Sequence, residues 1–289
     1  MQSDKNKQSD KNNTILVPSD FTQIGDYAVD NAVKLAKDLN FSICVLHVIN
    51  KETKKNLEKQ NKPIEYIEEQ LTSITDRIKK GHNIEASHIS REGSIFSVIA
   101  EVADEIMANY VVIGTHGKKG LQFLVGSFAL KVIKSSPVPV FVVQGPPENN
   151  NVQDIVFPLN LDPGSKQKVK WAIVMNEQFN ANFHLYIDNQ SDEFSQNRIK
   201  GDLKQIKRIL EKHNISYTET FSEKKISYSQ QLVAYAKNIN SSFIMISTDP
   251  DKTSINPFGS HDERIIYNQE KLPVMCINAQ DLKVFIGGL

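Results

Sequence analysis

The chain has 289 residues, of which 39% are hydrophobic, so it can bury the core of one large domain or of two ordinary ones. Its 34 lysines and arginines balance its 34 aspartates and glutamates, which argues against nucleic acid as a main partner. No run approaches the roughly 20 apolar residues that cross a membrane. Cys44 and Cys276 lie in apolar runs without metal or redox spacing, so we expect buried thiols and a cytoplasmic location.

Residues 1–13 are polar and contain the sequence Gln-Ser-Asp-Lys-Asn twice. They hold no apolar segment of the kind found in signal peptides. A segment of such low hydrophobicity cannot bury enough surface to fold. We expect a disordered tail over 1–13.

From Thr14 onward, short β-branched runs alternate with segments whose apolar residues recur at helical spacing. This alternation is typical of parallel strands joined by crossover helices. The charged residues 51–62 are interpreted as a mobile, solvated segment. The predicted strands of the first half cover 15–17, 42–48, 84–89, 110–113 and 138–143, and helical periodicity covers 28–39, 64–78, 95–106 and 130–133.

A polar, proline-bearing segment over 145–151 precedes a second series of similar runs. Strands are expected there at 155–158, 183–187, 243–246 and 272–277, and Phe258-Gly259-Ser260 matches Val125-Gly126-Ser127. Landmarks repeated in the same order indicate an internal repeat. We predict an α/β chain with two flavodoxin-like, or Rossmann-like, open parallel sheets of about five strands and helices on both faces. The domains would span 14–144 and 152–289, with a linker over 145–151.

The stretch 111–127 runs from an apolar strand through a glycine-rich basic loop to a second glycine, a hydroxyl and an apolar-periodic helix. Gly114 and Gly117 would let the backbone approach a ligand closely, and the N–H groups of the loop and of the next helix would converge. Such a spot attracts phosphate. Alone this signal is weak, because α/β proteins also use glycines merely to turn tightly.

In a doubly wound sheet, ligands bind beyond the carboxyl ends of the strands, at the switch point. Pro18 and Val48 would meet the glycine loop there and offer apolar walls for a flat base. Asp20 would offer a carboxylate to a ribose hydroxyl, an amino group or Mg²⁺. The combination predicts a mononucleotide site, although Asp20 and Ser127 would also suit helix N-caps.

The first half resembles a universal stress protein domain, and the whole chain resembles a tandem member of that family. The resemblance rests on residues 15–21 and 46–49, and on Gly114-Thr115-His116-Gly117 followed by Gly126-Ser127. It implies ATP or AMP as ligand of the first domain, with Mg²⁺ as a further candidate. The nucleotide-binding residues it implies are Pro18, Asp20, Val48, Ile113, Gly114, Gly117, Gly126, Ser127 and Phe128. Eight residues separate Gly117 from Gly126, one fewer than in the usual ATP-binding pattern.

The second half departs further from the pattern. Ser247-Thr248-Asp249-Pro250 stands in place of the glycine loop and brings a carboxylate and a proline without an N–H to the phosphate position. Asn160 replaces Asp20, and only Gly259-Ser260 is kept. We expect residues 152–289 to bind no ATP and to act as a packing or regulatory partner.

The last strand of each half is apolar, and an open apolar edge invites pairing with another strand. In single-domain relatives this edge forms the dimer. The resemblance therefore implies that residues 138–143 and 274–277 pair within the chain, and that the protein is a homodimer. The alternative is that residues 279–289 cover one edge.

The sequence offers no general base, Walker lysine or metal-holding carboxylate pair for phosphoryl transfer, so we expect no catalytic residues and at most slow ATP hydrolysis. His116 is interpreted as a locally bonded loop residue and His47 as a satisfied, partly buried imidazole. The favoured interpretation is a cytoplasmic stress-response protein with a regulatory nucleotide site. The alternatives are a nucleotide-free interaction scaffold and an adenylyl-transferring enzyme on a similar fold.

Overall fold

The computed structural model describes residues 13–115, 125–148, 151–161, 168–223, 226–248 and 261–278. The strands are β1 (Thr14–Pro18), β2 (Ser42–Ile49), β3 (Ala86–Glu92), β4 (Tyr110–Gly114), β5 (Val140–Val143), β6 (Asp154–Leu159), β7 (Asn182–Ile187), β8 (Tyr217–Phe221), β9 (Phe243–Thr248) and β10 (Val274–Asn278). The helices are α1 (Gln23–Leu39), α2 (Lys51–Lys59), α3 (Tyr66–His82), α4 (Ile95–Glu105), α5 (Val125–Ser135), α7 (Val169–Phe179), α8 (Glu193–Lys212), α9 (Tyr228–Asn238) and α10 (His261–Ile266). The predicted α/β class and its alternating order are confirmed.

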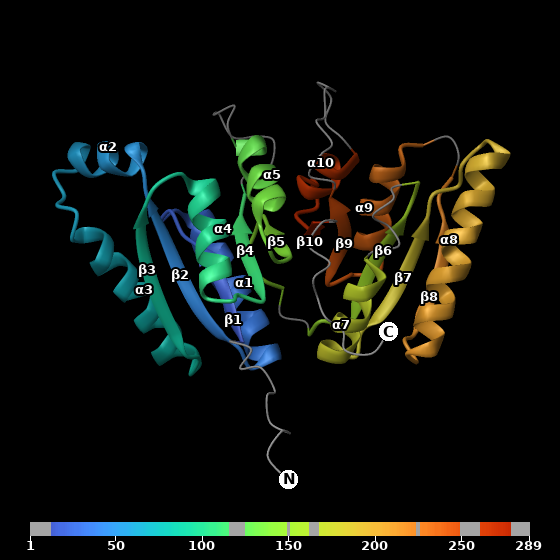
Figure 1. Ribbon diagram of the computed structural model, residues 1–289, viewed down its shortest axis with the longest axis horizontal. Coiled ribbons are helices and arrows are strands. Elements are labelled where there is room, and N and C mark those ends of the chain that lie inside the picture. The colour runs from blue at the N-terminus through green and yellow to red at the C-terminus, as the bar shows by residue number, and fades with distance from the viewer. Residues whose placement is uncertain are drawn as a thin grey trace, which may run out of the picture.

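The strands of both halves form one ten-stranded sheet in the order β3-β2-β1-β4-β5-β10-β9-β6-β7-β8 (Figure 1). Within each half neighbouring strands run parallel. The halves meet where β5 and β10 pair antiparallel, with Val142 opposite Val274 and Val140 opposite Cys276. The two five-stranded sheets expected from the sequence are therefore continuous with each other.

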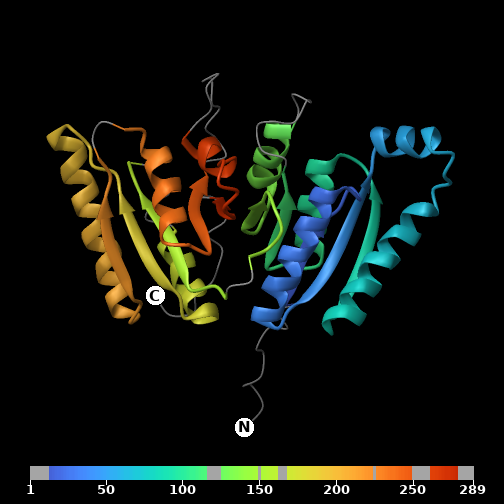
Figure 2. The same cartoon turned by 180° about the vertical axis from the view of Figure 1, so that it is seen from behind.

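Two apolar cores cover the two faces of this sheet. One lies beneath α1, α3, α7 and α8, and the other beneath α4, α5, α9 and α10. Each core contains residues from both halves, so both cores continue across the junction. Figures 1 and 2 show α5 and α10 side by side over this junction, and the Asn278 amide of β10 donates to the carbonyl of Lys134 in α5.

The halves repeat the same local geometry, which defines equivalent positions. Helices α1 and α7 end at the left-handed residues Asn40 and Asn180, and each is followed after one residue by a strand. Ile15 of β1 lies opposite Tyr110, as Ile155 of β6 lies opposite Phe243. By this correspondence, Asn31 is equivalent to Trp171, Asp38 to Gln178, Val48 to Asp188 and Tyr110 to Phe243.

The structure corrects the interpretation of residues 51–62. Residues Lys51–Lys59 form the helix α2, and none of its side chains is buried. The Asn50 side chain caps this helix by accepting a hydrogen bond from the Thr53 N–H at 2.9 Å. An N-cap of this kind stabilises a helix start by about 1 kcal/mol. The charged composition of the segment gave no indication of this helix.

The expected tails lie outside the described residues, apart from Asn13. Among the residues that are described, no helix is long and apolar enough to cross a membrane. In the same ranges, no group of three or more histidine, cysteine, aspartate or glutamate side chains could hold a metal ion.

Candidate functional site

The first half has its switch point between the carboxyl ends of β1 and β4, because these neighbours lead into helices on opposite faces of the sheet. Pro18 ends β1, Ile113 and Gly114 end β4, and Val48 lies near the end of β2. Asp20 follows β1 and is exposed. The residues predicted from these strands thus lie at one edge of the sheet. Gly126, Ser127 and Phe128 lie in the first turn of α5, and Gly117 lies outside the described residues.

A tight turn joins β1 to α1. The Asp20 Oδ1 atom accepts hydrogen bonds from the Thr22 N–H at 3.1 Å and from the Thr22 hydroxyl at 2.6 Å. Thr22, rather than Asp20, is the N-cap of α1, since its hydroxyl accepts from the Gly25 N–H. Asp20 therefore takes part in the turn after β1, as the alternative interpretation expected. Only one of its two carboxylate oxygens accepts these hydrogen bonds.

Gly114 lies directly against the start of α1. A Cβ atom at this position would lie 2.4 Å from the Ile24 carbonyl oxygen and 2.6 Å from Ile24 Cγ2. Both distances are shorter than any van der Waals contact. Only glycine lets the end of β4 approach the first turn of α1 this closely, which brings the α1 N–H groups toward the crevice.

The edge of β2 faces the space beyond the end of β1. The Ser19 N–H, directly after β1, donates to the Leu46 carbonyl at 2.8 Å. Main-chain groups alternate between the two sides of a strand, so those of Val48 point to the same side as those of Leu46. The Val48 carbonyl accepts from the Thr53 hydroxyl at 3.2 Å. Val48 therefore offers main-chain atoms as well as an apolar wall.

His47 is only half satisfied, so the interpretation of this residue as a satisfied imidazole was wrong. Its Nδ1 atom lies 2.8 Å from the Ser19 carbonyl, but its Nε2 atom is buried without a hydrogen-bond partner in the described part of the chain. The Thr115 hydroxyl, directly after β4, is likewise buried without a partner there. Each such group costs roughly 1–3 kcal/mol. Buried polar groups of this kind are commonly completed by water or a ligand.

Phe21 stacks on the same imidazole, with ring centroids 4.4 Å apart and planes 11° from parallel. Its backbone is left-handed, with φ of 60°, which is unfavourable for a bulky residue. Strain of this kind concentrates at functional sites. The Phe21 ring covers one face of the His47 ring.

Burial lowers the pKa of His47 below its usual value of 6.5, while the Ser19 hydrogen bond and the Asp20 charge oppose this only in part. The unfolded chain therefore binds the proton more readily. The contribution of His47 to the free energy of unfolding is therefore fully present above pH 6.5, and it decreases as the pH falls toward the pKa of the folded state. We expect His47→Gln to remove this pH-dependent component. Urea unfolding of both proteins between pH 5 and pH 8 measures it, and parallel curves would refute it.

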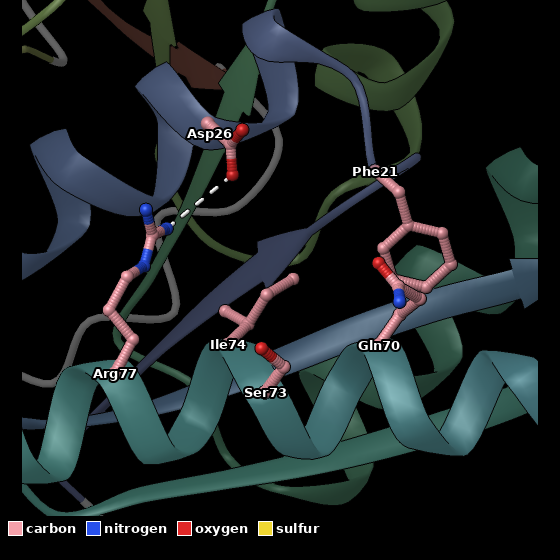
Figure 3. Close-up of a pocket in the computed structure, with 6 residues that line it drawn as sticks. All are labelled: Phe21, Asp26, Gln70, Ser73, Ile74 and Arg77. Atoms are coloured by element: carbon pink, nitrogen blue, oxygen red, sulfur yellow. Dashed lines mark hydrogen bonds and ion pairs between the residues drawn. The ribbon is translucent and has the colours of Figure 1, made fainter.

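A small cavity of about 210 Å³ opens beside this turn, between α1 and α3 (Figure 3). The Arg77 guanidinium crosses it to Asp26 at 3.4 Å and to Asp30 at 3.8 Å. These charges are about half exposed, so the pairs contribute little to stability. Apart from Phe21, no residue of the β1–α1 turn lines this cavity, and it is separate from the predicted site.

The equivalent crevice of the second half lies between β6 and β9 and is lined by different side chains. The Asp154 carbonyl accepts from Ser242 on the β9 side, so the Pro158 carbonyl, four residues later, also faces β9. The Lys168 ammonium donates to this Pro158 carbonyl and lies 4.5 Å from the Phe157 ring centroid. Lys168 is 2% exposed. A buried lysine side chain thus occupies the end of β6.

Asp188 takes the place that Val48 has in the first half. Its Oδ2 atom accepts from the Gln190 amide at 2.6 Å. Burial raises the pKa of the Asp188 carboxyl, and hydrogen bonds from Gln190 and Ser222 oppose this. The valine side chain of the first half is therefore replaced by a carboxylate. The loop 249–260, with Asp249, Pro250, Gly259 and Ser260, lies outside the described residues.

Comparison with known proteins agrees with this geometry. The model of the universal stress protein family matches residues 11–144. Universal stress protein G of Salmonella typhimurium is 30% identical over 140 residues, which make up 45% of this chain and 98% of that protein. The chain belongs to the universal stress protein family. A universal stress protein of Methanocaldococcus jannaschii is 28% identical over 141 residues, covering 46% of this chain and 82% of that protein.

A solved structure extends the likeness to both halves. The crystal structure of a universal stress protein from Archaeoglobus fulgidus matches with a TM-score of 0.74 and covers 93% of this chain and 99% of that one. At 17% sequence identity, this comparison shows a shared fold. The tandem, Rossmann-like arrangement predicted for this family member is thus shared with a solved relative.

Two features of the site were not found by sequence reasoning. Lys168 was missed because lysines are mostly exposed, and only its place before an apolar-periodic helix could have drawn attention to it. The stacking of Phe21 on His47 was missed because it depends on a left-handed backbone at Phe21, and phenylalanine rarely adopts that conformation.

Proposed function

We propose that the first half binds a nucleotide, ATP or AMP, in the crevice between β1 and β4, and that the protein is a stress-response regulator rather than a catalyst. The observation that carries the proposal is the pair of buried, unpartnered polar atoms at this edge, His47 Nε2 and Thr115 Oγ1, which have no hydrogen-bond partner among the described residues. Thr115 directly follows Gly114, which brings β4 against the start of α1, and His47 lies on β2, where its ring bonds to the Ser19 carbonyl directly after β1. A ligand with polar groups would remove the cost of leaving them unpaired.

Each predicted residue has a role in this proposal. Pro18, Ile113 and the Val48 main chain would enclose the base, and the free oxygen of Asp20 would meet the ribose or a bound Mg²⁺. The loop from Gly114 to Gly117 would hold the phosphates. The first turn of α5, with Gly126, Ser127 and Phe128, would add main-chain N–H groups and the positive end of a helix dipole.

The second half would act as a regulatory or packing partner without nucleotide. The Lys168 ammonium and the Asp188 carboxylate occupy the equivalent crevice and already have partners of their own. We also propose a cytoplasmic location, where Cys44 and Cys276 stay reduced in the core. A homodimer would form through another surface, because β5 and β10 are already paired.

A nucleotide-free scaffold is the second candidate. One observation favours it, namely that Asp20 already accepts two hydrogen bonds from Thr22 within its own turn. A carboxylate held in this way needs no ribose to be satisfied.

Thermal unfolding with Mg·ATP, AMP or cyclic AMP separates the two candidates. A ligand at 100 times its dissociation constant should stabilise the native protein by about 2.7 kcal/mol. Gly117→Asp should abolish the shift by placing a carboxylate among the phosphates. Gly201→Asp is the control, because nothing lies within 4 Å of a Cβ at this α8 position in the second half. If millimolar nucleotide causes no shift in the unfolding temperature and the purified protein carries no bound nucleotide, the nucleotide-free scaffold is the function that remains.

A further inference from the structure

The junction between the halves contains two equivalent positions, one beneath α7 and one beneath α1. On the α7 side, the Trp171 ring packs 6.2 Å from Tyr110, and the Tyr110 hydroxyl donates to Gln178 Oε1 at 2.6 Å. Tyr110 is 1% exposed and Trp171 is 8% exposed. An indole and a tyrosine hydroxyl therefore close this side of the junction.

The same positions beneath α1 carry smaller or shorter groups. Asn31 stands in place of Trp171, Asp38 in place of Gln178, and Phe243 in place of Tyr110. Asn31 turns instead to the segment between the halves, where its amide donates to the Gly145 carbonyl at 3.0 Å. The indole and the hydroxyl that fill the α7 side have no counterparts here.

A cavity of about 700 Å³ lies at this position. Its volume falls within the range of small-molecule sites, and junctions between domains are among their commonest locations. The cavity opens to solvent between the two halves, so it is a surface pocket and not an internal void. The cavity contacts α1, β4 and β5 on one side and β9 and the residues before β10 on the other.

The floor of the cavity is aromatic and aliphatic. Phe141 and Phe243 meet edge to face with ring centroids 5.3 Å apart, and Val112 and Val143 extend the same surface. Pro273 adds a further apolar wall. The phenylalanine and valine side chains are almost fully buried and give the cavity an apolar floor that a flat ring can contact.

The rim of the cavity is predominantly acidic. Four carboxylates line it, against the two ammonium groups of Lys34 and Lys271, and the carboxylates belong to Asp38, Glu148, Asp154 and Glu270. Lys34 is 3.5 Å from Asp38, and Asp154 pairs with His184 at 2.9 Å. Once these pairs are set aside, the carboxylates of Glu148 and Glu270 face the single ammonium group of Lys271. This excess of negative charge favours a positive charge or a hydrogen-bond donor in the ligand.

We propose that this cavity is a second ligand site, for a planar aromatic molecule that carries a positive charge. The ring would occupy the place that the Trp171 side chain fills on the other side of the junction, and the charge would lie near Glu148 and Glu270. Such a ligand would contact both halves and the segment between them. The site is independent of the nucleotide proposal, because it shares no residue with the crevice between β1 and β4.

Tryptamine, indole and indole-3-acetate are matched probes for this site, since they share one ring and differ in charge. Calorimetric titration of the full chain should show binding in the order tryptamine, indole, indole-3-acetate, with roughly tenfold between the first and the last. Glu270→Gln should weaken tryptamine several-fold and leave indole unchanged. Equal binding of all three probes, or none at millimolar concentration, would overturn the proposal.

Asn31→Trp copies the residue of the closed side and should fill the cavity. We expect it to abolish tryptamine binding and to raise the unfolding temperature. Lys37→Trp adds the same ring to the exposed surface of α1 and should leave binding unchanged. Undiminished binding by Asn31→Trp would place the probe elsewhere. If that variant does not fold, the order of the three probes and the effect of Glu270→Gln still decide the outcome.

Discussion

Gly114→Ala should lower the free energy of unfolding by roughly 2–3 kcal/mol, near the upper end for an overpacked site. The added methyl group would lie 2.4 Å from the Ile24 carbonyl oxygen. A backbone atom cannot rotate away as a side chain can, so α1 must move from the end of β4. Urea unfolding followed by circular dichroism measures the loss.

Gly201→Ala is the matched control for this substitution. Gly201 lies in the middle of α8, and a Cβ atom added there would have no neighbouring atom within 4 Å. Alanine at this position should raise stability by about 0.5–1 kcal/mol, because glycine loses more conformational entropy in a helix. If the two variants were equally stable, Gly114 would not be needed for a close approach. Loss of nucleotide-induced stabilisation in Gly114→Ala would further connect this contact to the proposed site.

Trp171→Ala should cost about 3–5 kcal/mol, the range for large aromatic residues in cores. Trp171 is the single tryptophan of the chain and packs against Tyr110 of the other half. Its removal would open a second space at the junction and leave the Tyr110 hydroxyl nearer to water. Since the core beneath α1 and α7 is continuous across the halves, we also expect the variant to broaden the unfolding transition.

Far-UV circular dichroism in urea suits this measurement, because the variant has no tryptophan fluorescence. Phe194→Ala is the control, since Phe194 is 81% exposed and its truncation should change stability by no more than about 0.5 kcal/mol. A cost below about 1 kcal/mol for Trp171→Ala would mean that the junction relaxes into the space.

The strands and most helices could be predicted because each carries its periodicity in its own residues. Ile15, Leu16 and Val17 are buried on both faces of the sheet and form a continuous apolar run. The same holds for Val111 and Val112 in β4. The edge location of Pro18, Val48 and Gly114 followed from the rule that parallel strands present their carboxyl ends together.

Features that depend on distant partners could not be predicted in the same way. The exclusion of a Cβ at Gly114 comes from Ile24, which is far away in sequence. The contrast between Asn31 and Trp171 has meaning only once the two helices are known to lie at equivalent positions. Helix α2 was missed for a local reason, since its stability comes from the Asn50 cap and its surface is charged throughout.

The antiparallel pairing of β5 with β10 joins strands of a single polypeptide. The contact is therefore unimolecular, and tethering of this kind supplies an effective concentration that dilution cannot lower. A pair built from separate subunits can exchange partners and is populated according to their abundance. Here translation produces one first half and one second half in every molecule, so the composition of the pair is fixed. Each side of the junction can also change its residues without imposing the same change on the other side.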